Sequence, residues 1–175
     1  KVNPNLCVGC GACTTVCPTG ALTYAYPRAS EQGVKLKTLL NTYQKAGGKD
    51  AVILLHSQDA GQALVNELGR AAQLKVAKGL PAHVIPVALW HTASLGLDVW
   101  LTALAYGAAQ VLVLNTAEEA PQYAEGLQAQ MAQAQAMLEG LGYAKPGRMP
   151  VQLLHATQAL ELDAELQRLT TGQQR

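Results

Sequence analysis

The sequence lacks phenylalanine altogether, and aromatic residues make up only 5% of its 175 residues. The core must therefore be built from alanine, leucine and valine, which favours helices packed closely on an aliphatic sheet. No run of about 18 apolar residues is present to span a bilayer, and no secretory signal is recognisable. The formal charge of +1 is close to neutral, so we expect neither a nucleic-acid partner nor a membrane partner.

Motifs for nucleotide binding and for nucleophilic catalysis are also missing. The sequence has no G-x-G-x-x-G after its first apolar run and no G-x-x-x-x-G-K-[ST] loop, so no phosphate-binding loop supports a nucleotide ligand. No G-x-S-x-G elbow is present, and the neighbouring residues His56-Ser57-Gln58-Asp59 do not make a triad merely by adjacency. We therefore predict no catalytic residue and expect a carrier or an oxidoreductase subunit rather than a catalyst by itself.

Cysteine is absent beyond position 17, and the cysteines that exist form one run. The run is C-x2-C-x2-C-x3-C-P and consists of Cys7, Cys10, Cys13, Cys17 and Pro18. Three thiolates two residues apart on a tight loop suit three irons of one cubane cluster. Gly9 and Gly11 let the backbone turn closely, so that amide N–H groups can point at the sulfides. The alternatives are a small zinc knuckle and a reduced, metal-free loop.

Residues 3–24 resemble one half of a bacterial-type ferredoxin. The resemblance implies a 4Fe-4S cluster with Cys7, Cys10, Cys13 and Cys17 as metal ligands. In two-cluster ferredoxins the fourth cysteine of such a run binds the other cluster, and this chain has no second run. Lys1 is not an initiator residue, so we expect the chain to be cut within its ferredoxin module. An upstream segment of the same full-length protein would then supply the second run.

Beyond residue 48, aliphatic runs alternate with helix-length segments. Strands are predicted at 51–55, 83–89, 110–114 and 150–154, and helices at 34–45, 61–78, 95–106, 116–139 and 159–169. This alternation predicts an α/β fold, a small flavodoxin-like, doubly wound, parallel four-stranded sheet preceded by a partial ferredoxin-like segment. We expect the second strand at one edge, followed by the first, third and fourth. The predicted divisions are a cluster segment at 1–27, a hinge and linking helix at 28–48, and the α/β domain at 49–175.

Several local signals set the predicted boundaries. Residues 21–26 favour a short closing strand of the ferredoxin half, and residues 27–32 a polar hinge. Thr116 and Glu119 have the spacing of a capping box for the long helix. Pro86 indicates that the second strand lies at an edge or contains a bulge. Residues 170–175 are predicted to be a frayed tail.

Histidines recur where the predicted strands end. His56 follows the first strand, His91 the second and His155 the fourth, and Asn115-Thr116 follows the third. Because ligands bind at the carboxyl ends of parallel strands, we expect these residues to share one rim. A metal or ligand pocket is one interpretation, since neutral imidazole is a common metal ligand. The other is that histidine is a tolerable polar residue where a strand leaves the core.

A second resemblance covers residues 83–141, centred on the segment Leu104-Ala105-Tyr106-Gly107-Ala108-Ala109-Gln110 and the strand after it. It is similar to the delta subunit of methyl-viologen-reducing hydrogenase, an electron-transfer domain of oxidoreductase complexes. That family carries cysteines for a small iron–sulfur cluster in the two loops that correspond to 89–94 and 114–119. Neither loop contains a cysteine here, so the resemblance implies the fold and not that cluster.

Two hypotheses of function follow. The first is an iron–sulfur electron-transfer protein, whose ferredoxin module is attached to an α/β docking domain of a cytosolic oxidoreductase system. Its expected partner is a redox protein or an oxidoreductase subunit. The alternative is an interaction module with a mainly structural cluster and a degenerate, non-catalytic α/β domain. Four clustered thiols with no cysteine left for disulfide bridges favour a reducing compartment, so we expect a cytoplasmic protein.

Overall fold

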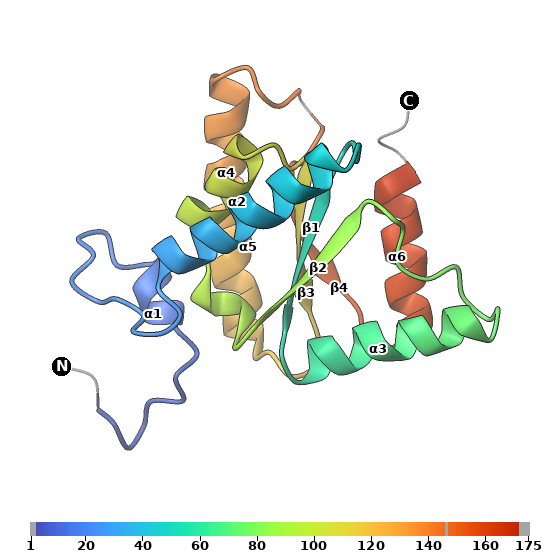
Figure 1. Ribbon diagram of the computed structural model, residues 1–175. Helices are drawn as coiled ribbons and strands as arrows, with labels where there is room; N and C mark the ends of the chain where they lie inside the picture. Colours follow the sequence, from blue (N-terminus) through green and yellow to red (C-terminus); the bar gives the residue numbers. More distant parts are fainter. Residues whose placement is uncertain (1–2, 146, 172–175) are drawn as a thin grey trace.

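A computed structural model describes residues 3–145 and 147–171 (Figure 1). Its centre is a four-stranded sheet in the order β2-β1-β3-β4, in which every pair of neighbours is parallel. The strands are β1 (Val52–Ser57), β2 (Val84–Leu89), β3 (Gln110–Asn115) and β4 (Val151–His155). The α/β class, the parallel sheet and the predicted strand order are thus confirmed.

The two faces of the sheet carry separate apolar cores, because alternate side chains of a strand point to opposite faces. In β1, Ile53 and Leu55 pack in one core, whereas Val52 and Leu54 pack in the other. The first core contains residues of α2 (Ala29–Lys45), α4 (Leu97–Ala105) and α5 (Pro121–Gly140). The second contains residues of α3 (Ala60–Gln73) and α6 (Ala159–Thr171). Helices therefore cover both faces, and the central strands are buried along their whole length.

Pro86 lies in β2, which is an edge strand of the sheet. Its side chain is exposed, and the residue has no N–H to give to a ladder. The prediction of an edge position is confirmed. The strand β2 leads directly into Trp90, His91 and the 3-10 helix η1 (Thr92–Ser94). The cluster segment contacts the sheet domain there, because its short helix packs against η1.

Three predicted boundaries are wrong. Residues 21–26 form no strand, because the described chain offers them no partner strand and a lone strand has no ladder to join. Most of the predicted hinge at 27–32 belongs to α2, which begins at Ala29. The start of this helix is capped by the Glu31 carboxylate, which accepts a hydrogen bond from the Arg28 N–H at 2.8 Å. Helix α3 ends at Gln73 rather than near residue 78.

The long helix also begins later than its apparent capping box. Glu119 does accept hydrogen bonds from the Thr116 N–H and hydroxyl, at 2.6 and 2.7 Å, but these close a turn outside the helix. The helix α5 starts at Pro121, which suits the first helical position because its missing N–H would have no partner there. At the other end of the chain, residues 170 and 171 belong to α6, and the rest of the predicted tail lies outside the described residues.

Candidate metal centre

The four cysteines lie on a loop that leads into α1 (Ala12–Thr15) and out again. Gly9 and Gly11 have φ of 72° and 78°, in the left-handed region that favours glycine. Gly11 has a second requirement, since a Cβ there would lie 2.8 Å from Cβ of Ser94 and 3.0 Å from Cε2 of Tyr24. The cluster loop is therefore folded closely onto η1, and only glycine fits at the point of closest approach.

The thiols are all free and accessible to some degree. Cys7 and Cys13 are exposed, and Cys10 and Cys17 are half-buried. The Thr19 hydroxyl lies 3.6 Å from the Cys17 sulfur and, with neighbouring backbone N–H groups, lowers the pKa of that thiol to about 7. Among the residues that the structure describes, no three histidine, cysteine or acidic side chains form a ready-made metal-binding group. The four thiols are present, but no three of them are gathered around a common point.

The loop backbone nevertheless fits an iron–sulfur cluster. The amide N–H groups of residues 8–13 donate no hydrogen bond to any described residue. Consecutive unpaired donors on a glycine-rich loop form a concavity suited to an anionic group such as cluster sulfides. With four free thiols in the same segment, the donor set matches a thiolate-bound cluster. Cys7, Cys10 and Cys13 would hold it from the loop.

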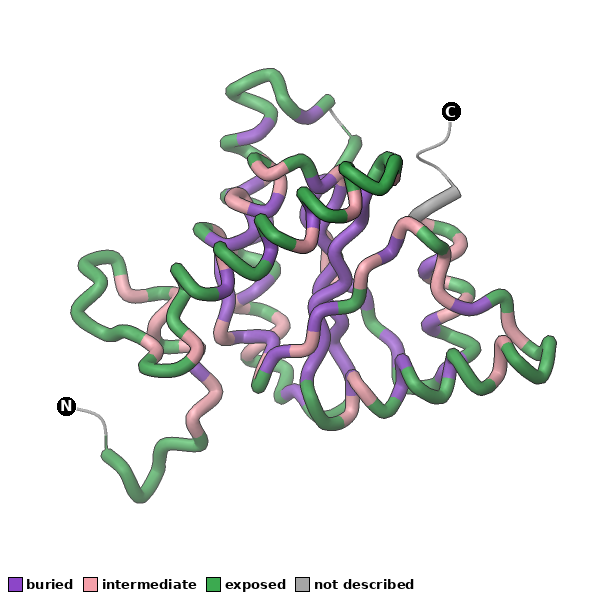
Figure 2. Tube along the Cα trace, in the orientation of Figure 1, coloured by how far each residue is buried: buried purple, intermediate pink, exposed green. Residues whose placement is uncertain are grey.

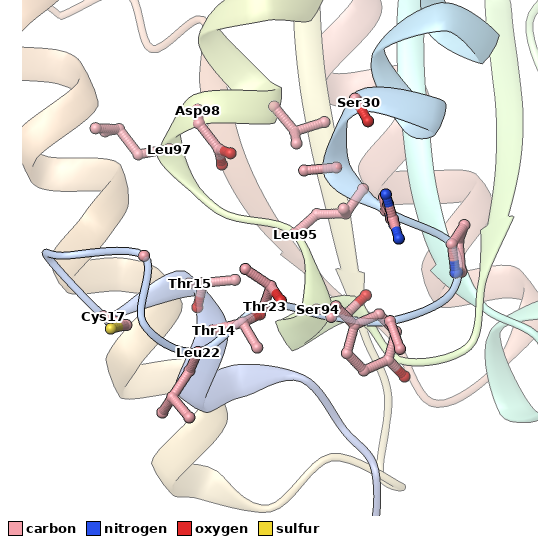
Figure 3. Close-up of a pocket in the computed structure, with 17 residues that line it drawn as sticks. Thr14, Thr15, Cys17, Leu22, Thr23, Ser30, Ser94, Leu95, Leu97 and Asp98 are labelled. Carbon is pink, nitrogen blue, oxygen red and sulfur yellow. The ribbon is translucent and has the colours of Figure 1, made fainter.

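Two cavities flank the loop, and they separate Cys17 from Cys7. A cavity of about 860 Å³ lies between the cluster segment and the start of α4, and Cys17 and Asp98 are among its lining residues (Figure 3). A second cavity, of about 810 Å³, is bounded by Cys7, Trp90 and the first turns of α2. No cysteine lines both cavities. Cys17 and Cys7 therefore line different cavities.

The cluster segment rests on the carboxyl edge of the sheet. The Tyr24 hydroxyl donates a hydrogen bond of 2.6 Å to the Gly9 carbonyl, and burial, followed by the charges of Cys10 and Cys7, raises the pKa of Tyr24. The pKa of Tyr123, in the first turn of α5, is raised by interaction with the Cys10 side chain, followed by burial and the charges of Cys10 and Cys7. Farther along α5, Gln130 donates to the Thr15 hydroxyl at 3.3 Å.

Sequence reasoning missed these supporting residues. Trp90 precedes His91 at the predicted rim of the sheet, so its place in the fold could be predicted from the sequence. No sequence motif linked Trp90 to the cysteines. Tyr123 and Gln130 lie in α5, whose sequence contains no signal of a contact with the cysteines. Their proximity to the cluster loop is created by the crossover that brings α5 past the end of β2, and no local signal in the sequence encodes that approach.

The rim histidines do lie on one edge of the sheet, as predicted, but they do not form one site. His56 is buried, its Nδ1 is 2.9 Å from the Ser57 carbonyl, and burial followed by the charge of Lys35 lowers its pKa. Nδ1 of His91 accepts a hydrogen bond from the Ala93 N–H at 3.1 Å. His155 contacts Asn115 on the adjacent strand, at 3.3 Å. Within the described ranges no metal-binding group includes any of them.

Other polar residues of the rim are occupied in capping. Glu118, which follows β3, accepts hydrogen bonds from the Ser57 hydroxyl at 3.3 Å and from the Ala60 N–H at 3.1 Å. The Ser57 hydroxyl in turn accepts the Gly61 N–H at 2.9 Å. A carboxylate at the N-terminus of α3 is stabilising because it pairs with unsatisfied N–H groups there. These contacts favour the structural interpretation of the rim over a ligand pocket.

Comparison with known proteins agrees with the cysteine pattern. Residues 1–23 match the family model of the 4Fe-4S binding domain. No curated protein matches the chain. The match supports a ferredoxin-type iron–sulfur segment and covers only the N-terminal part of the chain. Among the described residues, no helix has the length and apolar character needed to cross a membrane.

Proposed function

We propose that the protein is an iron–sulfur electron carrier in which a ferredoxin-type segment is mounted on an α/β docking domain. The observation that carries the proposal is the C-x2-C-x2-C-x3-C-P run of free cysteines within the stretch that matches a 4Fe-4S binding domain. In this run the N–H groups of residues 8–13 donate no hydrogen bond to any described residue. When bound, such a cluster exchanges single electrons without making or breaking bonds in the protein. The cysteines act as ligands.

The surroundings of the cysteines favour contact with another protein surface. Large apolar side chains that are more than half exposed gather there: Leu6, Val8, Val16, Tyr26 and Trp90. Exposed apolar groups of this kind mark interaction sites. We propose that a redox protein or an oxidoreductase subunit docks on this surface, and that an upstream segment of the full-length protein covers part of it. The free thiols favour a cytosolic setting.

A mainly structural cluster is the second candidate, and one observation favours it. The helix α1 has no buried residue, so the cysteine segment has almost no apolar core of its own. Segments with so little core commonly depend on a metal for their fold. The resemblance of residues 83–141 to the hydrogenase delta subunit remains a proposal: the order of β2, α4 and β3 is the one it implies, but the cysteines of that family are absent.

Iron and acid-labile sulfide analysis tests the proposed cofactor. We expect anaerobically prepared protein carrying an upstream cysteine run to hold two clusters, about eight irons. The 175-residue chain alone should hold no stable stoichiometric cluster and instead oxidise or take up zinc. About four irons in this chain alone would show that Cys17 completes the cluster in cis.

The reduction potential and the rate of electron exchange separate the two candidate functions. A carrier should show a reversible potential in the ferredoxin range and exchange electrons rapidly with a redox partner protein. A structural cluster would be lost on reduction or exchange slowly. Its removal would unfold residues 3–27 while the α/β domain stays folded.

A further inference from the structure

The cavity beside Cys7 has the size and the lining of a small-molecule site. Its volume is about 810 Å³, and ligand pockets commonly measure about 300–1,000 Å³. Three aromatic side chains border it, and two of them are largely uncovered by protein, since Trp90 is 55% exposed and Tyr26 is 83% exposed. Tyr24, which is half-buried, is the third. Aromatic rings left open in this way favour a planar aromatic ligand, because ring systems stack on one another.

Gln32 contributes an unsatisfied polar group to the cavity. This residue of α2 is only 6% exposed, it lines the cavity, and its Oε1 accepts no hydrogen bond from any described residue. A buried acceptor without a partner destabilises the folded state, so its retention needs a reason. The last torsion of a glutamine side chain is broad, so the amide can turn its oxygen toward the cavity at little cost. A ligand with an N–H group on its ring would supply the missing donor.

Two further polar side chains line the same cavity. Lys35 of α2 is exposed and forms no ion pair with a described residue. Glu31, one turn earlier, is occupied at the start of the helix, where it accepts the Arg28 N–H at 2.8 Å. The cavity therefore offers an unpaired ammonium group to an anionic substituent. Gln58, in the turn after β1, adds a second amide, which can donate to a ring carbonyl.

We propose that this cavity binds a planar heteroaromatic anion whose ring carries N–H and C=O groups, the chemistry that pterins and flavins share. The ring stacks on the side chains of Trp90 and Tyr26, its N–H group pairs with Gln32, and its anionic group pairs with Lys35. The sequence has no glycine-rich phosphate loop, so one ammonium group holds the anion and the ring supplies most of the affinity. This site goes beyond the proposed function, because it requires no cluster.

Calorimetric titration with two probes tests the site. The probes are pterin-6-carboxylate, with two fused rings, and FMN, with three, and their neutral counterparts are 6-methylpterin and riboflavin. At least one probe should bind as a single molecule per chain and more tightly than its neutral counterpart, and the better probe identifies the ring size. The full-length protein should bind it as the 175-residue chain does. Binding of neither probe, or binding that the full-length protein lacks, would overturn the proposal.

Gln32→Leu separates a ligand contact from a structural role. The variant should bind the better probe about threefold to tenfold more weakly, as expected for the loss of one hydrogen bond. Its melting temperature should stay the same or rise, because a buried acceptor without a partner is replaced by an apolar group. A structural amide would give the reverse, a lower melting temperature with unchanged affinity, and that result would remove Gln32 from the site.

Two more variants test the anion and the stacking separately. Lys35→Gln should remove the preference for the charged probe over its neutral counterpart. Lys37→Gln is the matched control on the same helix, because the Lys37 ammonium lies 5.6 Å over the Tyr106 ring and does not line the cavity. Trp90→Leu should weaken charged and neutral probes alike, by about tenfold. A preference that survives Lys35→Gln, or affinities unchanged in Trp90→Leu, would contradict the proposed contacts.

The site and the proposed function can fail separately, because the titrations are made on metal-free and on cluster-loaded protein. If the full-length protein takes up no iron and sulfide but binds a probe with these variant effects, the proposed function fails and the site stands. If the cluster assembles and neither probe binds, the site fails and the proposed function stands.

Discussion

Residues 3–28 contain a single buried residue, Gly11, whereas every residue of β1 and β3 is buried (Figure 2). The α/β domain has the apolar area needed to fold by the hydrophobic effect. The cysteine segment does not, and its order depends on contacts with η1 and α5 and on whatever its thiols bind. The two regions should therefore respond to different perturbations.

The largest effect is expected in the sheet. Leu112, in β3, is fully buried, and Leu112→Ala should lower the free energy of unfolding of the α/β domain by about 2–5 kcal/mol. Leu160→Ala is the control, because Leu160 is 54% exposed on α6 and its truncation should change stability by about 0.5 kcal/mol or less. Urea unfolding followed by circular dichroism measures both. Equal losses would contradict the core described here.

The second prediction concerns the attachment of the cluster segment. Gly11→Ala should free the segment from η1 at a local cost of about 1–3 kcal/mol, because the new Cβ overlaps Ser94. Hydrogen exchange at residues 11–15 and 92–94 should accelerate while the melting temperature of the α/β domain stays the same. Gly20→Ala has a similar positive φ with nothing within 4 Å, so it separates backbone strain from the clash. Identical exchange in the two variants would argue against close packing.

A third, smaller effect depends on pH. Burial, the larger cause, and the charge of Lys35 lower the pKa of His56 below its ordinary value of 6.5. The unfolded chain therefore binds a proton at a pH where the folded domain does not, and stability must fall as pH falls below about 6.5. His56→Gln should flatten this decline between pH 7.5 and 5. The comparison is made by thermal unfolding at several pH values, and an unchanged slope would exclude His56 as its source.

The smallest effect is expected at the end of α3. Lys75 has φ of 59° and follows the last helical turn, where the Val76 N–H donates to the Ala71 carbonyl at 2.9 Å. Glycine adopts this conformation without the steric penalty of a side chain, so Lys75→Gly should stabilise the domain by about 0.5–1 kcal/mol. Gly69→Lys, in the middle of the same helix, would serve as a control for changes of charge and propensity. A loss of stability in Lys75→Gly would show that the lysine stem contributes packing.

The sequence allowed the sheet to be predicted because buried parallel strands are continuous apolar runs that stand out from their surroundings. The runs that became β1 and β3 lie within one or two residues of the observed strands. The C-terminal end of a helix was less predictable where no glycine follows its last turn. Helix α3 ends at Gln73, just before Lys75 in the left-handed conformation, whereas the next glycine along the chain, Gly79, indicated a later end.

For the site, composition and spacing alone determined that this chain has four metal-type thiols on a glycine-rich loop and an aliphatic α/β domain behind them. Tertiary structure alone decided where the loop lies. The carboxyl edge of the sheet, the first turn of α5 and η1 meet at Gly11 and Cys10, although they are far apart along the chain. Ligand chemistry is local and is carried by a few residues in sequence. The environment of the ligands is not local, because it is made by crossovers whose packing depends on the whole sheet.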